Sequence, residues 1–108
     1  MNKLLELRRK GREQWYDVGS YKVLLRRPTG GEIIQHPYGE ELIRIAFVGW
    51  NLTELDLVPG GTDKPAEFDI DLALDWLMDE PEIYGKVLDA VIGMINAYNS
   101  RLKEAGKN

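Results

Sequence analysis

Apolar residues recur at two different spacings along the chain, and each spacing predicts a different kind of element. The clearest pattern runs from Tyr84 to Leu102, where apolar residues return every three or four positions. It predicts one helix of about 24 residues and roughly 36 Å, starting near Pro81, because proline suits the first helical position. So small a chain cannot easily cover a helix of this length, and part of its apolar surface is expected to face something outside its own core.

Aromatic and β-branched residues dominate the segment 14–28 instead. The pair Gly19-Ser20 suits a tight turn, and Pro28 ends the second half of the segment. Along that second half, every other residue from Tyr21 to Leu25 falls on one apolar face. The segment is therefore predicted to form a β-hairpin with one side on the core.

The next segment has the signals of two helices. Thr29 and Glu32 have the spacing of a capping box, in which each side chain satisfies a free backbone N–H at the helix start. Pro37 interrupts this helix, so we expect a short first piece and a stronger helix over Tyr38–Gly49. The second helix is predicted to end at Trp50.

A loop and a third helix follow. Two prolines and a glycine pair prevent regular structure over most of the loop 51–67, which is expected to be an acidic, flexible connector. Trp50 and Phe68 are expected to hold its two ends against the core. Asp69 is a good N-cap for a helix that ends near Met78.

Together these elements predict an α+β fold, in which an N-terminal β-hairpin packs against three to four α-helices with a long C-terminal helix. A length of 108 residues and an apolar content of 44% suit a single domain over residues 1–108. Within it we expect a basic arm over residues 1–12, the hairpin at 14–28, and a helical part at 29–108. The sequence leaves open whether the arm packs on the core or moves freely. The expected anchors of the core are Trp15, Trp50, Phe68 and Trp76.

The formal net charge of −4 hides an uneven distribution. Residues 1–27 carry eight Lys and Arg against three acidic residues, whereas residues 28–108 carry six against fifteen. Such a split occurs in proteins with a basic arm for nucleic acid, and equally in proteins whose parts or subunits attract each other. We favour attraction between parts of the protein, because a surface that follows phosphates normally makes the whole domain basic.

The chain contains no cysteine, which excludes disulfides and thiolate chemistry and fits a reducing compartment. No stretch approaches the roughly 20 apolar residues needed to cross a bilayer. Most charges of the N-terminus follow the short Leu/Glu/Leu patch of residues 4–7, which is the wrong order for a secretory signal. We therefore expect a cytoplasmic protein with no membrane partner.

Candidate catalytic and metal-binding residues are few. His36 is the only histidine and lies before Pro37 without an evident nucleophile, so a surface or capping role is expected. The acidic run Asp69–Asp75 lacks the ligand at position five and the glycine at position six of a calcium loop. Neither Gly30-Gly31 nor Gly60-Gly61 is followed by the Lys-Ser/Thr of a phosphate loop. We predict no catalytic residue, no metal and no cofactor.

The order of these features resembles a known family. A hairpin ending in "LLRRPTGGE", a helix closing on "VGW", a polar loop and then "EFDIDLALDWLMDEPEIYGKVLDAV" are similar to the tail assembly chaperones of long-tailed bacteriophages. The resemblance covers about residues 20–108 and rests on the order and spacing of the motifs. The chain departs from the pattern at Pro37-Tyr38-Gly39, where a more continuous helix is expected.

The resemblance implies a non-enzymatic protein that binds the long, helical tape measure protein in the host cytoplasm. It keeps this client soluble until tail tube subunits polymerise around it, and a longer frameshifted product in such families recruits tail tube protein. A client helix is expected to lie on an apolar stripe of the last helix, where methionine adapts to varied side chains. The stripe consists of Val87, Val91, Met94, Ile95, Tyr98 and Leu102.

Two alternatives stay open. A structural component of the head-to-tail connection or the tail tube would self-associate into rings or tubes, and the small core of such a chain leaves room for a homo-oligomer. A small nucleic-acid-binding regulator would bind with an affinity that falls steeply with salt. It would use Arg8, Arg9, Lys10, Arg12, Arg26 and Arg27.

Overall fold

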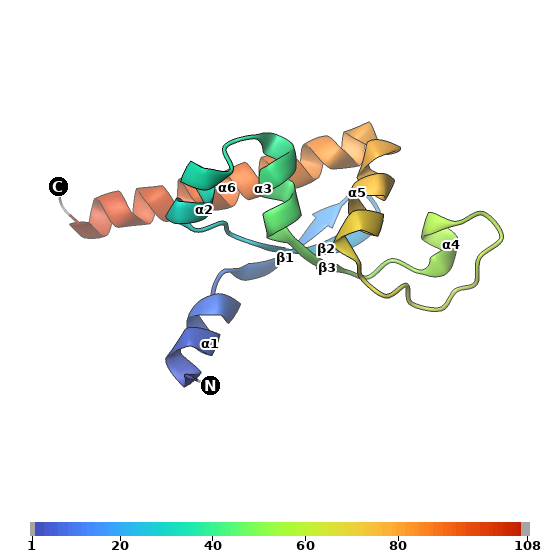
Figure 1. The fold of residues 1–108 in the computed structure, drawn as a ribbon, viewed down its shortest axis with the longest axis horizontal. Helices are drawn as coiled ribbons and strands as arrows, with labels where there is room; N and C mark the ends of the chain where they lie inside the picture. Colours follow the sequence, from blue (N-terminus) through green and yellow to red (C-terminus); the bar gives the residue numbers. More distant parts are fainter. Residues whose placement is uncertain (1, 107–108) are drawn as a thin grey trace.

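The computed structural model describes residues 2–106 and has the expected α+β fold (Figure 1). Three antiparallel strands, β1 (Glu13–Val18), β2 (Tyr21–Arg26) and β3 (Phe47–Trp50), form a sheet in the order β1-β2-β3. Helices cover one face of this sheet. The helices are α1 (Lys3–Lys10), α2 (Gly30–Gln35), α3 (Gly39–Ala46), α4 (Glu54–Leu57), α5 (Ile70–Met78) and α6 (Pro81–Gly106).

The predicted hairpin is confirmed as β1 and β2. Val18 pairs with Tyr21, so the two residues between them form the turn. Gly19 has a φ of 65°, which glycine adopts without the strain that a side chain would cause. Val18, Val23 and Leu25 are fully buried and present the apolar face of the hairpin to the helices.

The third strand corrects the predicted end of the helix over Tyr38–Gly49. α3 ends at Ala46, and Phe47–Trp50 form β3 instead. The helical spacing of apolar residues runs on through this boundary, but an extended backbone lets the segment pair with β2 while both aromatic rings stay buried. Pairing with a strand that is remote in sequence therefore decides the conformation here.

The helix starts confirm the predicted caps. Thr29 and Glu32 form a capping box at the start of α2. The Asp69 carboxylate accepts a hydrogen bond of 3.0 Å from the backbone N–H of Leu72 at the start of α5. Each cap satisfies a backbone N–H that the first turn of a helix leaves free.

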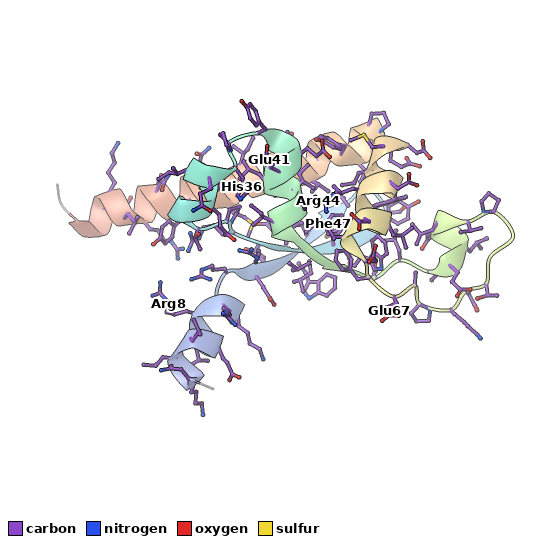
Figure 2. All side chains as sticks on the ribbon, viewed as in Figure 1. Arg8, His36, Glu41, Arg44, Phe47 and Glu67 are labelled. Carbon is purple, nitrogen blue, oxygen red and sulfur yellow. The ribbon has the colours of Figure 1, made fainter. Side chains whose placement is uncertain are left out.

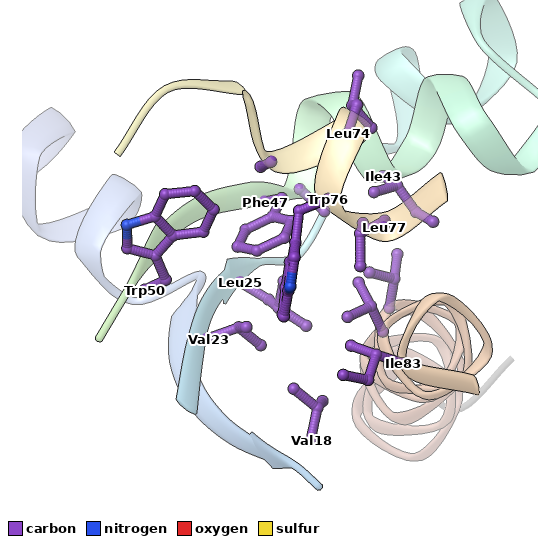
Figure 3. Packing of buried hydrophobic residues seen from close by; sticks show 14 of the residues in the cluster. Val18, Val23, Leu25, Ile43, Phe47, Trp50, Leu74, Trp76, Leu77 and Ile83 are labelled. Carbon is purple, nitrogen blue, oxygen red and sulfur yellow. The ribbon is translucent and has the colours of Figure 1, made fainter. Parts of the chain in front are cut away.

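The buried side chains form a cluster between the sheet and helices α3, α5 and α6 (Figure 3). The ring centroids of Phe47 and Phe68 lie 5.3 Å apart, and those of Trp50 and Trp76 lie 6.1 Å apart in an edge-to-face arrangement. Trp50 and Trp76 are buried, and the partly buried Phe68 packs against the cluster with its ring centroid 5.1 Å from that of Trp50. These three residues therefore anchor the core as predicted.

Trp15 is a correction to that prediction, because its side chain is 52% exposed. Trp15 pairs with Leu24 across β1 and β2, while its neighbour Tyr16 packs against the core. Successive residues of a strand point to opposite faces, and the burial of Val18 assigns Tyr16 to the covered face. Trp15 therefore lies on the face of the sheet that the helices leave open.

The loop between β3 and α5 is more ordered than predicted. α4 lies within it and begins with a capping box of Thr53 and Asp56. Thr53 also forms an isolated β-bridge with Pro65, and the Trp50 indole N–H donates a hydrogen bond of 2.9 Å to the carbonyl of Ala66. The two arms of the loop are thus held together beside Trp50, and the loop projects from one end of the molecule (Figure 1).

The first twelve residues, for which the sequence leaves the secondary structure open, contain the helix α1. The Asn2 side chain caps it by accepting a hydrogen bond of 3.0 Å from the Leu5 N–H. No residue of α1 is buried. In Figure 1 the helix stands off the sheet, away from the helices that cover the core.

α6 is the long helix that the sequence predicts, with 26 residues. Its first half packs on the core through Ile83, Val87 and Val91. Its second half continues beyond the core, where Leu102 is exposed. Across the described residues, no helix is both long enough and apolar enough to cross a membrane.

Candidate protein-binding groove

The six residues of the predicted partner stripe on α6 do not share one surface. Val87 and Val91 are fully buried in the core and cannot contact a partner in this structure, contrary to the expectation. Helical spacing shows that a face is apolar but not which part of it the rest of the chain covers. The other four members are half-buried or exposed: Met94, Ile95, Tyr98 and Leu102.

A groove of about 550 Å³ runs between the second half of α6 and β1. Its α6 side consists of residues that recur at helical spacing and are mostly small: Ala90, Gly93, Met94 and Ala97. A Cβ added at Gly93 would meet no atom within 4 Å. Small side chains let the backbone of a ligand or partner approach closely, so this side of the groove has room for an added segment.

Arginines surround one end of this groove. The guanidinium carbon of Arg27 lies 3.6 Å from the centroid of the Tyr98 ring, and that of Arg101 lies 5.9 Å from it. Burial, and repulsion from Arg12, Arg101 and Arg8, lower the pKa of Arg27. Three arginines and one glutamate, Glu13, line the groove, so its potential is positive.

Arg26 lies next to Arg27 in the chain, but its charge is balanced by Glu32 and adds little to this positive surface. Its guanidinium donates two hydrogen bonds, of 2.9 and 2.8 Å, to the Glu32 carboxylate. Glu32 also accepts a hydrogen bond of 2.8 Å from the Thr29 N–H. These contacts, above all the one with Arg26, lower the pKa of Glu32 to about 2. The pair ties the end of the hairpin to α2.

The residues considered for catalysis or metal binding have structural partners. His36 caps the end of α2, and its Nδ1 lies 2.9 Å from Oε1 of Glu41 (Figure 2). Asp69 caps α5, and Asp71 forms an exposed ion pair of 3.1 Å with Arg44. In the described part of the chain, no three His, Cys, Asp or Glu side chains are grouped so that they could hold a metal ion.

The sequence contains a signal for one side of the groove only. Ala90, Gly93 and Ala97 share a helical face, and a run of small residues on one face of a long helix marks a place of close approach. The opposite side comes from residues 11–16 at the other end of the chain. Only the tertiary structure brings these two segments together.

Comparisons with models of known protein families, with curated proteins and with solved structures find no match to this chain. A functional assignment therefore depends on the sequence motifs, the groove and the surfaces described above.

Proposed function

We propose that the protein is a non-enzymatic tail assembly chaperone of a long-tailed bacteriophage. In this role it binds the tape measure protein and keeps it soluble until tail tube subunits replace it. The order of motifs over about residues 20–108 supports the proposal. In the folded chain, the observation that carries it is the open groove beside α6, because its small-residue side leaves room for a partner helix.

A client helix would lie along the second half of α6. Met94 is flexible and polarisable, so it adapts to different apolar side chains along a client of varied sequence. Arg12, Arg27 and Arg101 would pair with acidic residues of the client beside that apolar contact. Exposed ion pairs contribute about 1 kcal/mol or less each, so a single site binds weakly.

Weak single sites suit this task. Many copies on one long client hold it in solution together, because each bound copy covers another stretch of apolar helix. Each copy is also released easily when a tube subunit competes for its stretch. A single tight site would instead block tube assembly.

Co-expression tests the proposal directly. The protein is produced together with the long helical product of a neighbouring tape measure gene, and the soluble fraction of that product is measured with and without the protein. We expect the soluble fraction to rise several-fold. No rise would contradict the proposed function.

Two glycines of α6 provide a matched pair of variants for the groove. Gly93→Leu places a side chain in the groove, and Gly85→Leu places the same side chain on the same helix outside the groove. Both positions have open space for a Cβ. We expect Gly93→Leu to abolish the gain in client solubility and Gly85→Leu to retain it. Equal behaviour of the two variants would place the client elsewhere.

Binding of nucleic acid is the second candidate, and the grouping of Arg8, Arg12 and Arg101 around Arg27 favours it. A phosphate-binding surface would give a labelled DNA duplex an affinity that falls steeply between 50 and 200 mM salt. Replacing Arg12 and Arg101 by Gln would lower that affinity. No shift of the duplex at low salt would exclude this candidate.

A further inference from the structure

α1 carries an apolar face that is left exposed. Its three leucines are all accessible, with exposed fractions of 70% for Leu4 and 56% for Leu7. Leu4 and Leu7 lie three positions apart and therefore share one face of the helix. A helix of eight residues is only marginally stable alone in water, so packing of this face would stabilise it.

An open apolar hollow of about 380 Å³ lies beside α4 and the first turn of α5. Two of the side chains that line it, Val58 and Leu72, are 56% and 39% exposed. Leu57 and Ala66 also line it, and so do the acidic residues Glu54 and Glu67. The hollow therefore offers an apolar surface with acidic groups at its margin.

The charges of the two surfaces are opposite. Residues 3–12 carry five Lys and Arg and one glutamate. Residues 51–80, which contain the hollow, carry nine acidic side chains and one lysine. Among the described residues, no ion pair links a basic side chain of α1 to an acidic group of its own chain. α1 and the hollow are therefore complementary both in their apolar surfaces and in their charges.

α1 cannot reach the hollow of its own chain. Only Gly11 and Arg12 connect it to β1. In Figure 1, α1 projects below the sheet while α4 lies toward the right-hand end of the molecule, whose longest dimension is 55 Å, and Figure 2 shows Arg8 and Glu67 correspondingly far apart. We propose that α1 of one copy docks with its leucine face in the α4–α5 hollow of a second copy.

The proposed contact runs in one direction, without reciprocal exchange of α1, so it is heterologous and leaves one α1 and one hollow free at the ends of every dimer. Further copies can add, and the chain grows head to tail. A helix of two turns covers less than the roughly 1,200 Å² of a stable interface, so each contact is weak, with a dissociation constant on the order of 10–100 μM. No residue of α1 or of the hollow lines the groove beside α6, although Gly11 and Arg12, which connect α1 to β1, do line it.

Sedimentation velocity of the full chain between 5 and 500 μM tests the proposal. We expect the weight-average mass to rise with concentration and to pass that of a dimer. A mass that stays monomeric over this range overturns the second copy as the occupant of the hollow. A mass that levels off at the dimer overturns head-to-tail growth.

Variants on the two surfaces separate this contact from unspecific association. Leu7→Glu alters α1, Leu72→Glu alters the hollow, and Ile34→Glu is the matched control on an exposed apolar residue of α2 outside both surfaces. We expect the self-association constants of the first two variants to be at least tenfold lower than that of the unchanged protein. The control should self-associate as the unchanged protein does. Circular dichroism confirms that each variant is folded.

Mixing the two impaired variants gives the sharpest result. Leu72→Glu retains an intact α1, and Leu7→Glu retains an intact hollow, so one good contact forms between them. The mixture should give a 1:1 dimer that does not grow further, although each variant alone stays monomeric. A mixture that stays monomeric, or a Leu7→Glu variant that associates like the unchanged protein, overturns the proposal.

Discussion

Arg26 and Arg27 are adjacent and chemically identical, yet they have different surroundings. Arg26 forms a two-pronged ion pair with Glu32, whereas Arg27 stacks on Tyr98 of α6. The spacing of Thr29 and Glu32 predicts the capping box, and the structure confirms it. The spacing does not predict the contact of Glu32 with Arg26, because that contact depends on the angle at which the hairpin meets α2.

Glu32→Gln tests the energetic weight of this carboxylate. Its pKa of about 2 in the folded chain lies below the value of about 4.3 expected when the chain is unfolded. The charge therefore stabilises the fold above about pH 4.5, and this stabilisation is lost as the pH falls toward 2. Glutamine keeps the cap but not the charge. Because the side chain is partly exposed and solvent screens it, we expect a loss of about 1 kcal/mol at pH 7.

Urea unfolding at pH 7 and pH 2.5 provides the measurement. The difference between Glu32→Gln and the unchanged protein should shrink at the lower pH. Asp17→Asn removes a well exposed ion pair with Lys22 and serves as control, with an expected change below about 0.5 kcal/mol at either pH. A loss for Glu32→Gln that is equal at both pH values would contradict the role of the charge.

At the level of elements, most local signals were sufficient, but they did not predict the end of α3 or the helix α4 within the loop 51–67. The hairpin turn at Gly19, the cap at Asp69 and the long helix from Pro81 follow from short-range patterns, which depend on the backbone of a few neighbouring residues. The change from helix to strand at Ala46 does not, because Phe47–Trp50 fit either period and pairing with β2 decides between them. The same limit explains Trp15, whose strand was predicted correctly but whose face was not.

Phe47→Ala and Trp15→Ala test the assignment of faces to β3 and β1. Phe47 is fully buried among aromatic rings, so its truncation should lower the free energy of unfolding by about 3–5 kcal/mol. Trp15 lies on the open face, and its truncation should cost about 1 kcal/mol or less. The midpoints of urea unfolding give both values. Similar losses for the two variants would show that the faces are assigned wrongly.

For the whole molecule, the uneven charge noted in the sequence becomes a spatial separation. The basic α1 projects from one side of an elongated molecule of 55 × 33 × 24 Å, whereas the acidic region around α4 and α5 lies toward one end of it. The sequence indicates attraction between parts or subunits, but it leaves open which of the two applies. The separation of these two regions favours attraction between copies, since neither region can reach the other within one chain.

Salt should therefore weaken the association of copies. Raising sodium chloride from 50 to 500 mM screens charges beyond a few ångströms, and we expect the self-association constant to fall about tenfold. Sedimentation velocity at the two salt concentrations measures this change. Association that strengthens in high salt would mean that the leucines act without help from the charges.

The sequence by itself determined the α+β class, the hairpin, the caps and the long last helix, because these follow from periodicity and from backbone hydrogen bonds over a few residues. The tertiary structure alone decided which part of the α6 face is buried, where β3 begins, and how β1 and α6 enclose a groove. These features depend on contacts between segments far apart in the chain. A local pattern shows which side chains of a helix or strand are apolar. Only the tertiary structure shows which of them another segment of the chain covers.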